Sequence, residues 1–200
     1  MSLFVEARVV SIALLLFIVL DPFGNLVTLN TLLRNHEPPR RRWIMLRESA
    51  IALGILLVAT FCGEAILKAL GLHGYALGIA GGIVLFMIAL GMLFPAHRVV
   101  ENSALEDPLI VPIAMPLIAG PSAISIVILL AEKHGALAVA GAVAIASITV
   151  AVILSVSPAI FAFLGRRGAL AMERLMGMLL VMLSVQMIFD GIDAYLKSRQ

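Results

Sequence analysis

Apolar residues dominate six long stretches of the chain, and short polar segments separate them. The stretches lie at about residues 5–33, 44–71, 75–95, 109–131, 136–164 and 173–195. Each can cross a hydrocarbon core of about 30 Å, which takes about 20 helical residues. Helices are expected rather than strands, because lipid offers no hydrogen-bond partner to an open sheet edge. The pattern therefore predicts an all-α membrane protein with six transmembrane helices.

Charged residues lie mostly in the connections between these stretches. Polar connections are expected at residues 34–42, 71–74, 97–107, 132–135 and 164–168. Nine basic residues fall on one side of the predicted membrane, namely Arg34, Arg40, Arg41, Arg42, Arg47, Arg98, Arg166, Arg167 and Arg174. Five fall on the other side, namely Arg8, Lys68, Lys133, Lys197 and Arg199. The positive-inside rule predicts that the first side is cytoplasmic and that both termini are periplasmic.

The composition agrees with a membrane protein and disfavours other classes. Of the 200 residues, 62% are hydrophobic and 13% are charged, so the chain cannot bury its apolar surface in a core of its own. The formal charge of +2 is spread over short loops, which disfavours a nucleic-acid partner. The apolar residues from Val9 to Leu20 follow Glu6 and Arg8 and precede no small-residue cleavage site, so we interpret them as part of a retained span.

An internal repeat relates the two halves of the chain. Residues 82–94 align with residues 177–189, with five of thirteen positions identical. Asp21-Pro22 in the first stretch and Gly120-Pro121 in the fourth lie 99 residues apart. Three spans per half is an odd number, so the second half is expected to be inverted in the membrane, as in many transporters. The predicted parts of this single transmembrane domain are a first repeat at 1–98, a polar linker at 99–107 and a second repeat at 108–200.

Proline interrupts the first and fourth stretches near their centres. It removes a backbone N–H and clashes with the carbonyl four residues earlier, so a helix bends or stops there. Asp21 and Gly120, each directly before a proline, are typical of an N-cap followed by the first helical residue. Spans one and four are therefore expected to be interrupted at mid-membrane, each as two half-helices. Pro108, Pro112 and Pro116 indicate that the first half of span four is irregular.

The two interruptions predict a binding site. Half-helices starting at Pro22 and Pro121 would direct free N–H groups towards a substrate carboxylate at the protein centre. Asp21 and nearby carbonyls suit an ammonium group or a coupling Na⁺. The predicted substrate-binding residues are Asp21, Pro22, Gly24, Asn25, Thr28, Gly120, Pro121, Ser122 and Ser125. The alternative is a pair of tolerated proline kinks, with Asp21 only capping a helix.

Other polar and small residues receive simpler interpretations. Gln186 and Asp190 lie one turn apart near the outer end of span six, and serve either in gating or coupling or as a wet surface. Arg47-Glu48 is expected to anchor the inner end of span two, and Glu173-Arg174 to begin span six at the cytoplasmic face. Gly74, Gly78 and Gly82 recur every four positions and predict close helix packing.

Several signatures of enzymes and metal sites are absent from the sequence. All four histidines lie in predicted loops, so no intramembrane histidine cluster is expected to bind a metal ion. No phosphate-binding loop, H-E-x-x-H or G-x-S-x-G motif occurs. We therefore expect no enzyme activity, no metal site and no cofactor beyond a coupling Na⁺ or H⁺.

A series of motifs runs in order along nearly the whole chain. They are Asp21-Pro22-Phe23-Gly24-Asn25, Arg40-Arg41-Arg42 with Arg47-Glu48, Gly81-Gly82-Ile83 with Leu85-Phe86, the proline-rich residues 108–121, Glu173-Arg174 with Gly177, and Gln186-Met187 with Asp190-Gly191-Ile192. Together they resemble the MarC family, also called the neutral amino-acid transporter family. The resemblance implies six spans in the inner membrane. After archaeal members that move glycine and alanine, it also implies cation-coupled transport of small neutral amino acids.

Three other functions are compatible with the sequence. They are an exporter of small metabolites with the same architecture, a non-transporting membrane subunit and an intramembrane enzyme. An enzyme needs paired acid and base groups, whereas the middle of the predicted spans offers only Asp21 as an acid. A subunit would not need the two central breaks. The predicted partners are the lipid bilayer and a small-molecule substrate, and the sequence leaves homo-oligomerisation open.

Overall fold

The computed structural model describes residues 2–33, 37–94 and 119–199, and these contain helices but no strand. The helices are α1 (Ser2–Leu20), α2 (Leu26–Leu32), α3 (Pro38–Ala69), α4 (Gly74–Leu93), α5 (Pro121–His134), α6 (Ala136–Ser155) and α7 (Ser157–Ser198). This confirms the prediction of an all-α protein. The predicted linker at 99–107 and the prolines Pro108, Pro112 and Pro116 lie outside the described residues.

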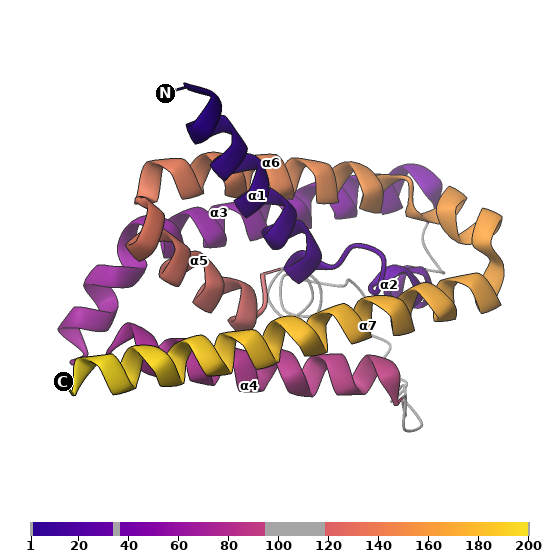
Figure 1. Ribbon diagram of the computed structural model, residues 1–200. Helices are drawn as coiled ribbons and strands as arrows, with labels where there is room; N and C mark the ends of the chain where they lie inside the picture. The colour runs from indigo at the N-terminus through magenta and orange to yellow at the C-terminus, as the bar shows by residue number, and fades with distance from the viewer. Residues whose placement is uncertain (1, 34–36, 95–118, 200) are drawn as a thin grey trace.

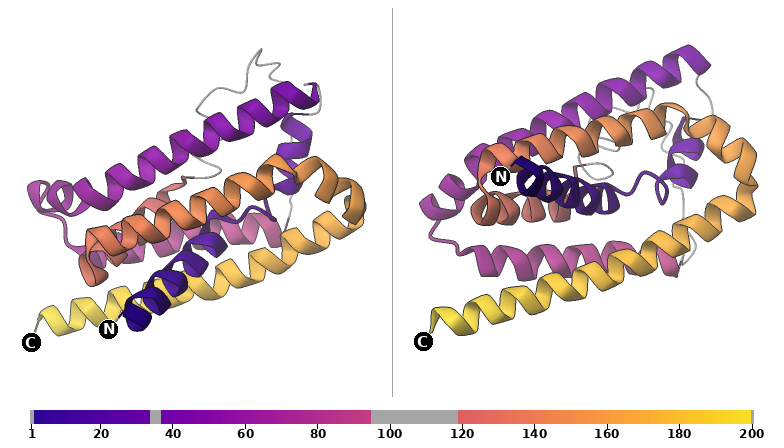
Figure 2. Two further views of the ribbon diagram at one scale, coloured as in Figure 1. Left: turned by 90° about the horizontal axis from the view of Figure 1, so that it is seen from above. Right: turned by 45° about the horizontal axis from the view of Figure 1, so that its top comes forward.

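The long helices form two pairs, with α1 and α5 between them (Figures 1 and 2). In one pair α3 packs on α6, and in the other α4 packs on α7. Helix α5 contacts α3, α4 and α6, while α1 contacts α5, α6 and α7. The beginning of α1 and the end of α7 lie towards the same end of the bundle (left in Figure 1). Helices α1 and α5 thus lie between the two pairs, although one side of α1 stays exposed, as at Val10 and Leu14.

Four helices are long and apolar enough to cross a membrane, namely α3, α4, α6 and α7. Large apolar side chains on them face outwards, including Phe163 at 91% exposure and Leu137 at 82%. A water-soluble monomer rarely exposes apolar surface so widely, whereas lipid covers it without cost. The described residues therefore form a helical membrane protein. Of the other two predicted spans, the first contains α1, with 19 residues, and the described part of the fourth contains α5, with 14 residues.

Two of the predicted turns occur where the sequence placed them. Helix α3 ends at Ala69 and α4 begins at Gly74, which confirms the turn at 71–74. Helix α5 ends at His134 and α6 begins at Ala136, with Gly135 between them at φ 88°. A residue with a side chain rarely adopts this left-handed backbone, so glycine allows the chain to reverse within one residue.

Two predicted boundaries were wrong. Helix α3 begins at Pro38, so Arg40, Arg41 and Arg42 lie in its first turns and not in a loop. Proline favours this first position because it has no N–H to leave unpaired. The expected single span at 136–164 is divided, since α6 ends at Ser155 and α7 begins at Ser157. Pro158 explains the division, because it cannot donate the hydrogen bond that a continuous helix would require. The turn expected at 164–168 is confirmed, because Gly165 has a non-helical backbone with φ 66° and interrupts α7 there.

Small residues allow α4 and α7 to approach closely, as the glycine spacing predicted. A Cβ atom added to Gly82 would lie 2.9 Å from the Ser184 carbonyl oxygen and 2.8 Å from Ile188 Cγ1. Gly78 also faces α7, whereas Gly74 faces Glu132 on α5. In lipid the helices gain little from the hydrophobic effect, so close packing of this kind holds them together.

Replacing Gly82 by alanine should therefore destabilise the bundle. The added methyl group meets α7 backbone that cannot move aside freely, and we expect a loss of about 1–3 kcal/mol and a lower Tm. Gly91→Ala is the matched control, because no atom lies within 4 Å of an added Cβ there and alanine favours the helix. Thermal unfolding of the purified protein in detergent measures both. Equal Tm values for the two variants would contradict the proposed packing.

Candidate functional site

The break between α1 and α2 is the centre of the candidate site. Residues 21–25 are not helical, and Asp21 has φ 43°, in the left-handed region. Asp21 is only 4% exposed, and its Oδ1 accepts a hydrogen bond of 2.9 Å from the Gly24 N–H. Asn25 Nδ2 donates to the Asp21 carbonyl at 3.0 Å. The side chains of the segment thus supply hydrogen bonds that a continuous helix would have supplied.

The prediction that a half-helix starts at Pro22 was wrong, because α2 begins at Leu26. Asp21 does accept the bond from the residue three places on, as an N-cap does. The residues that follow explain why helix does not begin at once. Gly24 and Asn25 are poor helix formers, and Asn25 uses its amide on the Asp21 carbonyl. The interruption of the first span is confirmed, but its second helix is short, with seven residues.

The second predicted break is confirmed in its described half. Gly120 is the N-cap of α5 and Pro121 is in its first turn. The first hydrogen bond of the α-helical pattern runs from the Ile124 N–H to the Gly120 carbonyl, at 3.1 Å. The N–H groups of Ser122 and Ala123 precede it and have no acceptor within the helix. Both residues are buried, so α5 directs its amino-terminal end into the protein.

The serines predicted to bind substrate are both buried on α5. Ser122 is 4% exposed and Ser125 is 5% exposed. The Ser125 hydroxyl donates to the Pro121 carbonyl at 2.8 Å, and Gly81 of α4 packs against its side chain. Ser125 therefore holds the first turn of α5 together, and its hydroxyl proton is already used within the helix.

Two further helices bring residues to Asp21. Gly24 lies so close to Met92 of α4 that an added Cβ would overlap the end of that side chain. Glu173 of α7 is also buried and interacts electrostatically with Asp21. Glu173 therefore adds a second negative charge to the surroundings of the Asp21 carboxylate. In the described ranges no group of three or more His, Cys, Asp or Glu residues could hold a metal ion.

Other predicted residues do not join this centre. Gln186 and Asp190 are exposed on α7 and bond to each other, with Gln186 Nε2 donating to Asp190 Oδ1 at 2.7 Å. They follow Glu173 by 13 residues or more, which is about 20 Å along a helix. Thr28 is half-buried on α2, beyond the break. The structure thus separates the candidate gating residues from the buried carboxylates.

Two buried acids were missed as site residues by the sequence analysis. Glu173 was expected at the cytoplasmic end of a span, and Glu48 was expected to anchor an interface. Glu48 is fully buried, and its Oε1 accepts bonds from Arg47 at 2.7 and 2.9 Å. Its Oε2 has no hydrogen-bond partner among the described residues. The spacing of apolar residues could have predicted that Glu48 is buried. It lies four residues from Ile44 and four from Ala52, so all three share the buried face of α3.

Comparisons with known proteins place the chain in a family. The model of the MarC family of integral membrane proteins matches residues 7–196. An inner membrane protein of Escherichia coli K12 named YhgN, of the UPF0056 group, is 42% identical, with 95% of this chain and 98% of that protein covered. UPF0056 membrane proteins of Buchnera aphidicola (subspecies Baizongia pistaciae) and Aquifex aeolicus are 40% and 30% identical, covering 94% and 91% of this chain. No solved structure gives a significant match.

Asp21→Ala should destabilise the break more than Asp21→Asn. Alanine removes the acceptor of the Gly24 N–H and tolerates positive φ poorly, so we expect a loss of about 1–3 kcal/mol. Asparagine keeps an acceptor oxygen, adopts the left-handed region readily and removes the repulsion from Glu173. The Tm of each variant in detergent measures the difference. If both variants unfold at the same temperature, the Asp21–Gly24 hydrogen bond does not hold the break.

Proposed function

The chain belongs to the MarC family of integral membrane proteins, and on this premise we propose that it is a secondary transporter of small neutral amino acids. One observation carries the proposal, namely that a non-helical segment with a buried carboxylate lies in the interior of a membrane bundle. Irregular backbone at membrane depth is tolerated where it is buried in protein or lines a cavity. Intramembrane carboxylates commonly mark ion or substrate pathways.

The two carboxylates support coupling to a cation. Asp21 and Glu173 oppose each other electrostatically, so entry of H⁺ or Na⁺ beside Asp21 relieves their repulsion. A helix end also leaves its last carbonyl groups without partners inside the helix, and carbonyls together with a carboxylate suit Na⁺. A transporter that binds substrate and cation in one central site can couple their movements.

The amino-terminal end of α5 supports recognition of a carboxylate. Ser122 and Ala123 in its first turn are buried, and their N–H groups carry the positive end of the helix dipole. α5 packs against α1, the helix that ends at Asp21. A zwitterion would find an acceptor for its ammonium group at Asp21 and donors for its carboxylate at α5.

The packing of the helices supports two inverted repeats. In such a repeat, α1 and α2 correspond to α5, α3 corresponds to α6, and α4 corresponds to α7. Each main contact between helices then has a counterpart between the corresponding helices of the other half. Thus α1 packs on α6 as α5 packs on α3, and α5 packs on α4 as α2 packs on α7. Gly82 and Gly177, which the repeat aligns, take reciprocal places. Gly82 meets the Ser184 carbonyl of α7, and Gly177 meets the Ala89 carbonyl of α4. Rocking of one half against the other would give alternating access.

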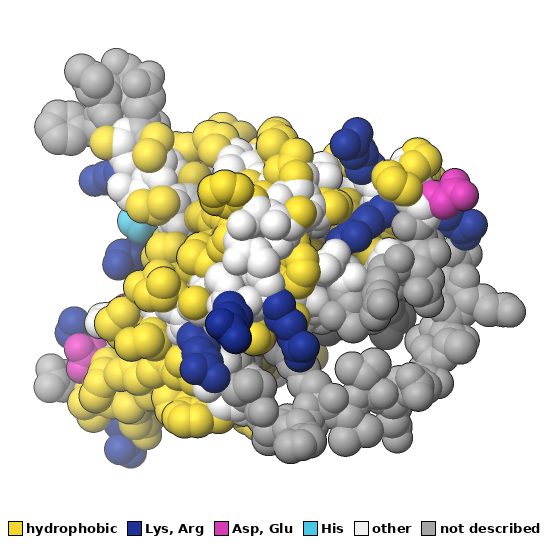
Figure 3. Space-filling view, turned by 90° about the vertical axis from the view of Figure 1, so that its right-hand side faces the viewer, with side chains coloured by type: hydrophobic (Ala, Val, Ile, Leu, Met, Phe, Trp, Pro, Cys, Tyr) yellow, Lys and Arg dark blue, Asp and Glu magenta, His cyan; other side chains and the backbone are white. Residues whose placement is uncertain are grey.

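The charges support a topology with both termini in the periplasm. The beginning of α3 and the Gly165 break of α7 lie at one end of the bundle, where Figure 3 shows several Lys and Arg side chains. The positive-inside rule assigns this end to the cytoplasm. The Escherichia coli relative is named an inner membrane protein, and we propose the same location for this chain.

Purified protein in liposomes should take up labelled glycine and alanine when a Na⁺ or proton gradient is imposed. Asp21→Asn should lower the gradient-driven rate at least about tenfold, because the cation loses its carboxylate. Asp193→Asn is the control, since that carboxylate is exposed on α7. Uptake of no small amino acid under either gradient would refute the proposed substrate. An unchanged rate in Asp21→Asn would remove Asp21 from the mechanism.

The proposed topology can be tested by labelling single cysteines. Cys62 is the only cysteine, so Cys62→Ser gives a background without thiols. In that background, Lys133→Cys should react with a membrane-impermeant maleimide in intact spheroplasts, because it lies at the periplasmic end. Arg166→Cys should react only after the membrane is permeabilised. The reverse labelling pattern would invert the topology.

A further inference from the structure

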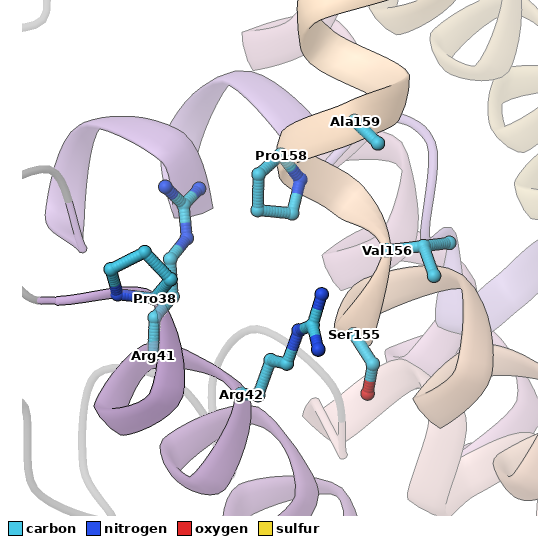
Figure 4. Close-up of a pocket in the computed structure, with 7 residues that line it drawn as sticks. All are labelled: Pro38, Arg41, Arg42, Ser155, Val156, Pro158 and Ala159. Carbon is cyan, nitrogen blue, oxygen red and sulfur yellow. The ribbon is translucent and has the colours of Figure 1, made fainter.

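A cavity of about 230 Å³ lies where the first turns of α3 meet the junction of α6 and α7 (Figure 4). We call it the basic cavity. Arg41 and Arg42 line it on the α3 side, and Val156, Pro158 and Ala159 line it on the other side. Among the described residues that line it, none is acidic. In this part of the chain, the cavity therefore combines two positive charges with an apolar wall and has no acid to neutralise them.

Arg41 has a donor group that its neighbours leave unused. Its Nη2 donates to Asn30 Oδ1 of α2 at 2.7 Å, which fixes the guanidinium group beside the cavity. Its Nε is buried and has no hydrogen-bond partner in the part of the chain that the structure describes. A guanidinium group has five N–H donors, so the others, where Arg41 lines the cavity, can donate to a ligand there. Arg42 is exposed and provides a second guanidinium group to the same ligand.

The depth of the cavity in the membrane also suits an anionic group. Trp43 follows Arg42 and is 59% exposed, and Arg47 lies over its ring at 4.9 Å from the centroid. Exposed tryptophan beside basic residues is typical of the membrane–water interface, the depth at which lipid phosphates lie. The cavity is smaller than the about 300–1,000 Å³ of sites for drug-sized ligands, so it suits a headgroup or a small ion.

We propose that the basic cavity binds a phosphate group through Arg41 and Arg42. A phosphate presents several acceptor oxygens, so it can accept hydrogen bonds from both guanidinium groups at once. The phosphate belongs either to an anionic lipid or to a soluble ion. This site shares no lining residue with the buried centre at Asp21, and it stands whether or not the chain transports amino acids. Through the Arg41–Asn30 bond, the bound phosphate would also hold α2 against α3.

The test measures binding by wild-type protein to two probes. The first probe is phosphatidylglycerol, compared with phosphatidylcholine, with retained lipid counted by native mass spectrometry. The second is inorganic phosphate added to delipidated protein in detergent, compared with chloride at equal ionic strength, with the Tm as readout. Retention of phosphatidylglycerol alone identifies lipid as the source, and a Tm increase with phosphate identifies a soluble ion. If wild-type protein responds to neither probe, the proposal is wrong.

Variants assign the binding to the basic cavity. R41Q/R42Q should weaken binding of the active probe about tenfold or more, because two charge-assisted contacts are lost. R166Q/R167Q is the matched control, since it removes two exposed charges outside the cavity and should change binding less than about twofold. Ala159→Trp keeps both arginines but fills the cavity, so it should also weaken binding. It remains informative if R41Q/R42Q does not fold. Wild-type affinity in Ala159→Trp, or an equal loss in R166Q/R167Q, would overturn the proposal.

Discussion

The rest of this structure depends on one constraint. Within lipid, every backbone N–H and C=O needs a hydrogen-bond partner from the protein itself. A helix meets it automatically, and most of the described residues are helical. The segment at residues 21–25 leaves the helix and must meet it in another way. The Asp21 carboxylate accepts the Gly24 N–H, and the Asn25 amide donates to the Asp21 carbonyl. A polar side chain is therefore required at Asp21 by the backbone, before any role in transport is considered.

The remaining helices keep this segment away from lipid. The pairs α3–α6 and α4–α7 lie on either side of α1 and α5. Because lipid tails are as apolar as the side chains, the pairs depend on close packing, which the glycines of α4 and α7 permit. The same closeness appears at Gly24, where the break meets Met92 of α4. The small residue Gly24 thus allows the irregular backbone to lie directly against α4.

Charge is distributed differently in the interior and at one end of the bundle. In the interior, Asp21 and Glu173 are buried acids that interact electrostatically. At the end where α3 begins, Arg41 and Arg42 line a cavity whose described lining residues include no acid. Helix α2 therefore connects a region of negative charge with a region of positive charge. It follows the break at Asp21, and its Asn30 accepts a hydrogen bond from Arg41 beside the cavity.

Hydropathy and proline placement determined much of this fold from the sequence alone. They gave the helical membrane class, the turns at 71–74 and at Gly135, the break at Asp21 and the start of α5 at Pro121, because these features depend on local chemistry. Tertiary structure decided which side chains meet. Glu173 lies about 150 residues from Asp21 in the sequence yet interacts with it, and Arg41 lines a cavity only because the α6–α7 junction closes the other side. Each helix is apolar on several faces, so the sequence does not show which face is buried. Packing against the other helices decides which face, and which of the few charged side chains, lies in the interior.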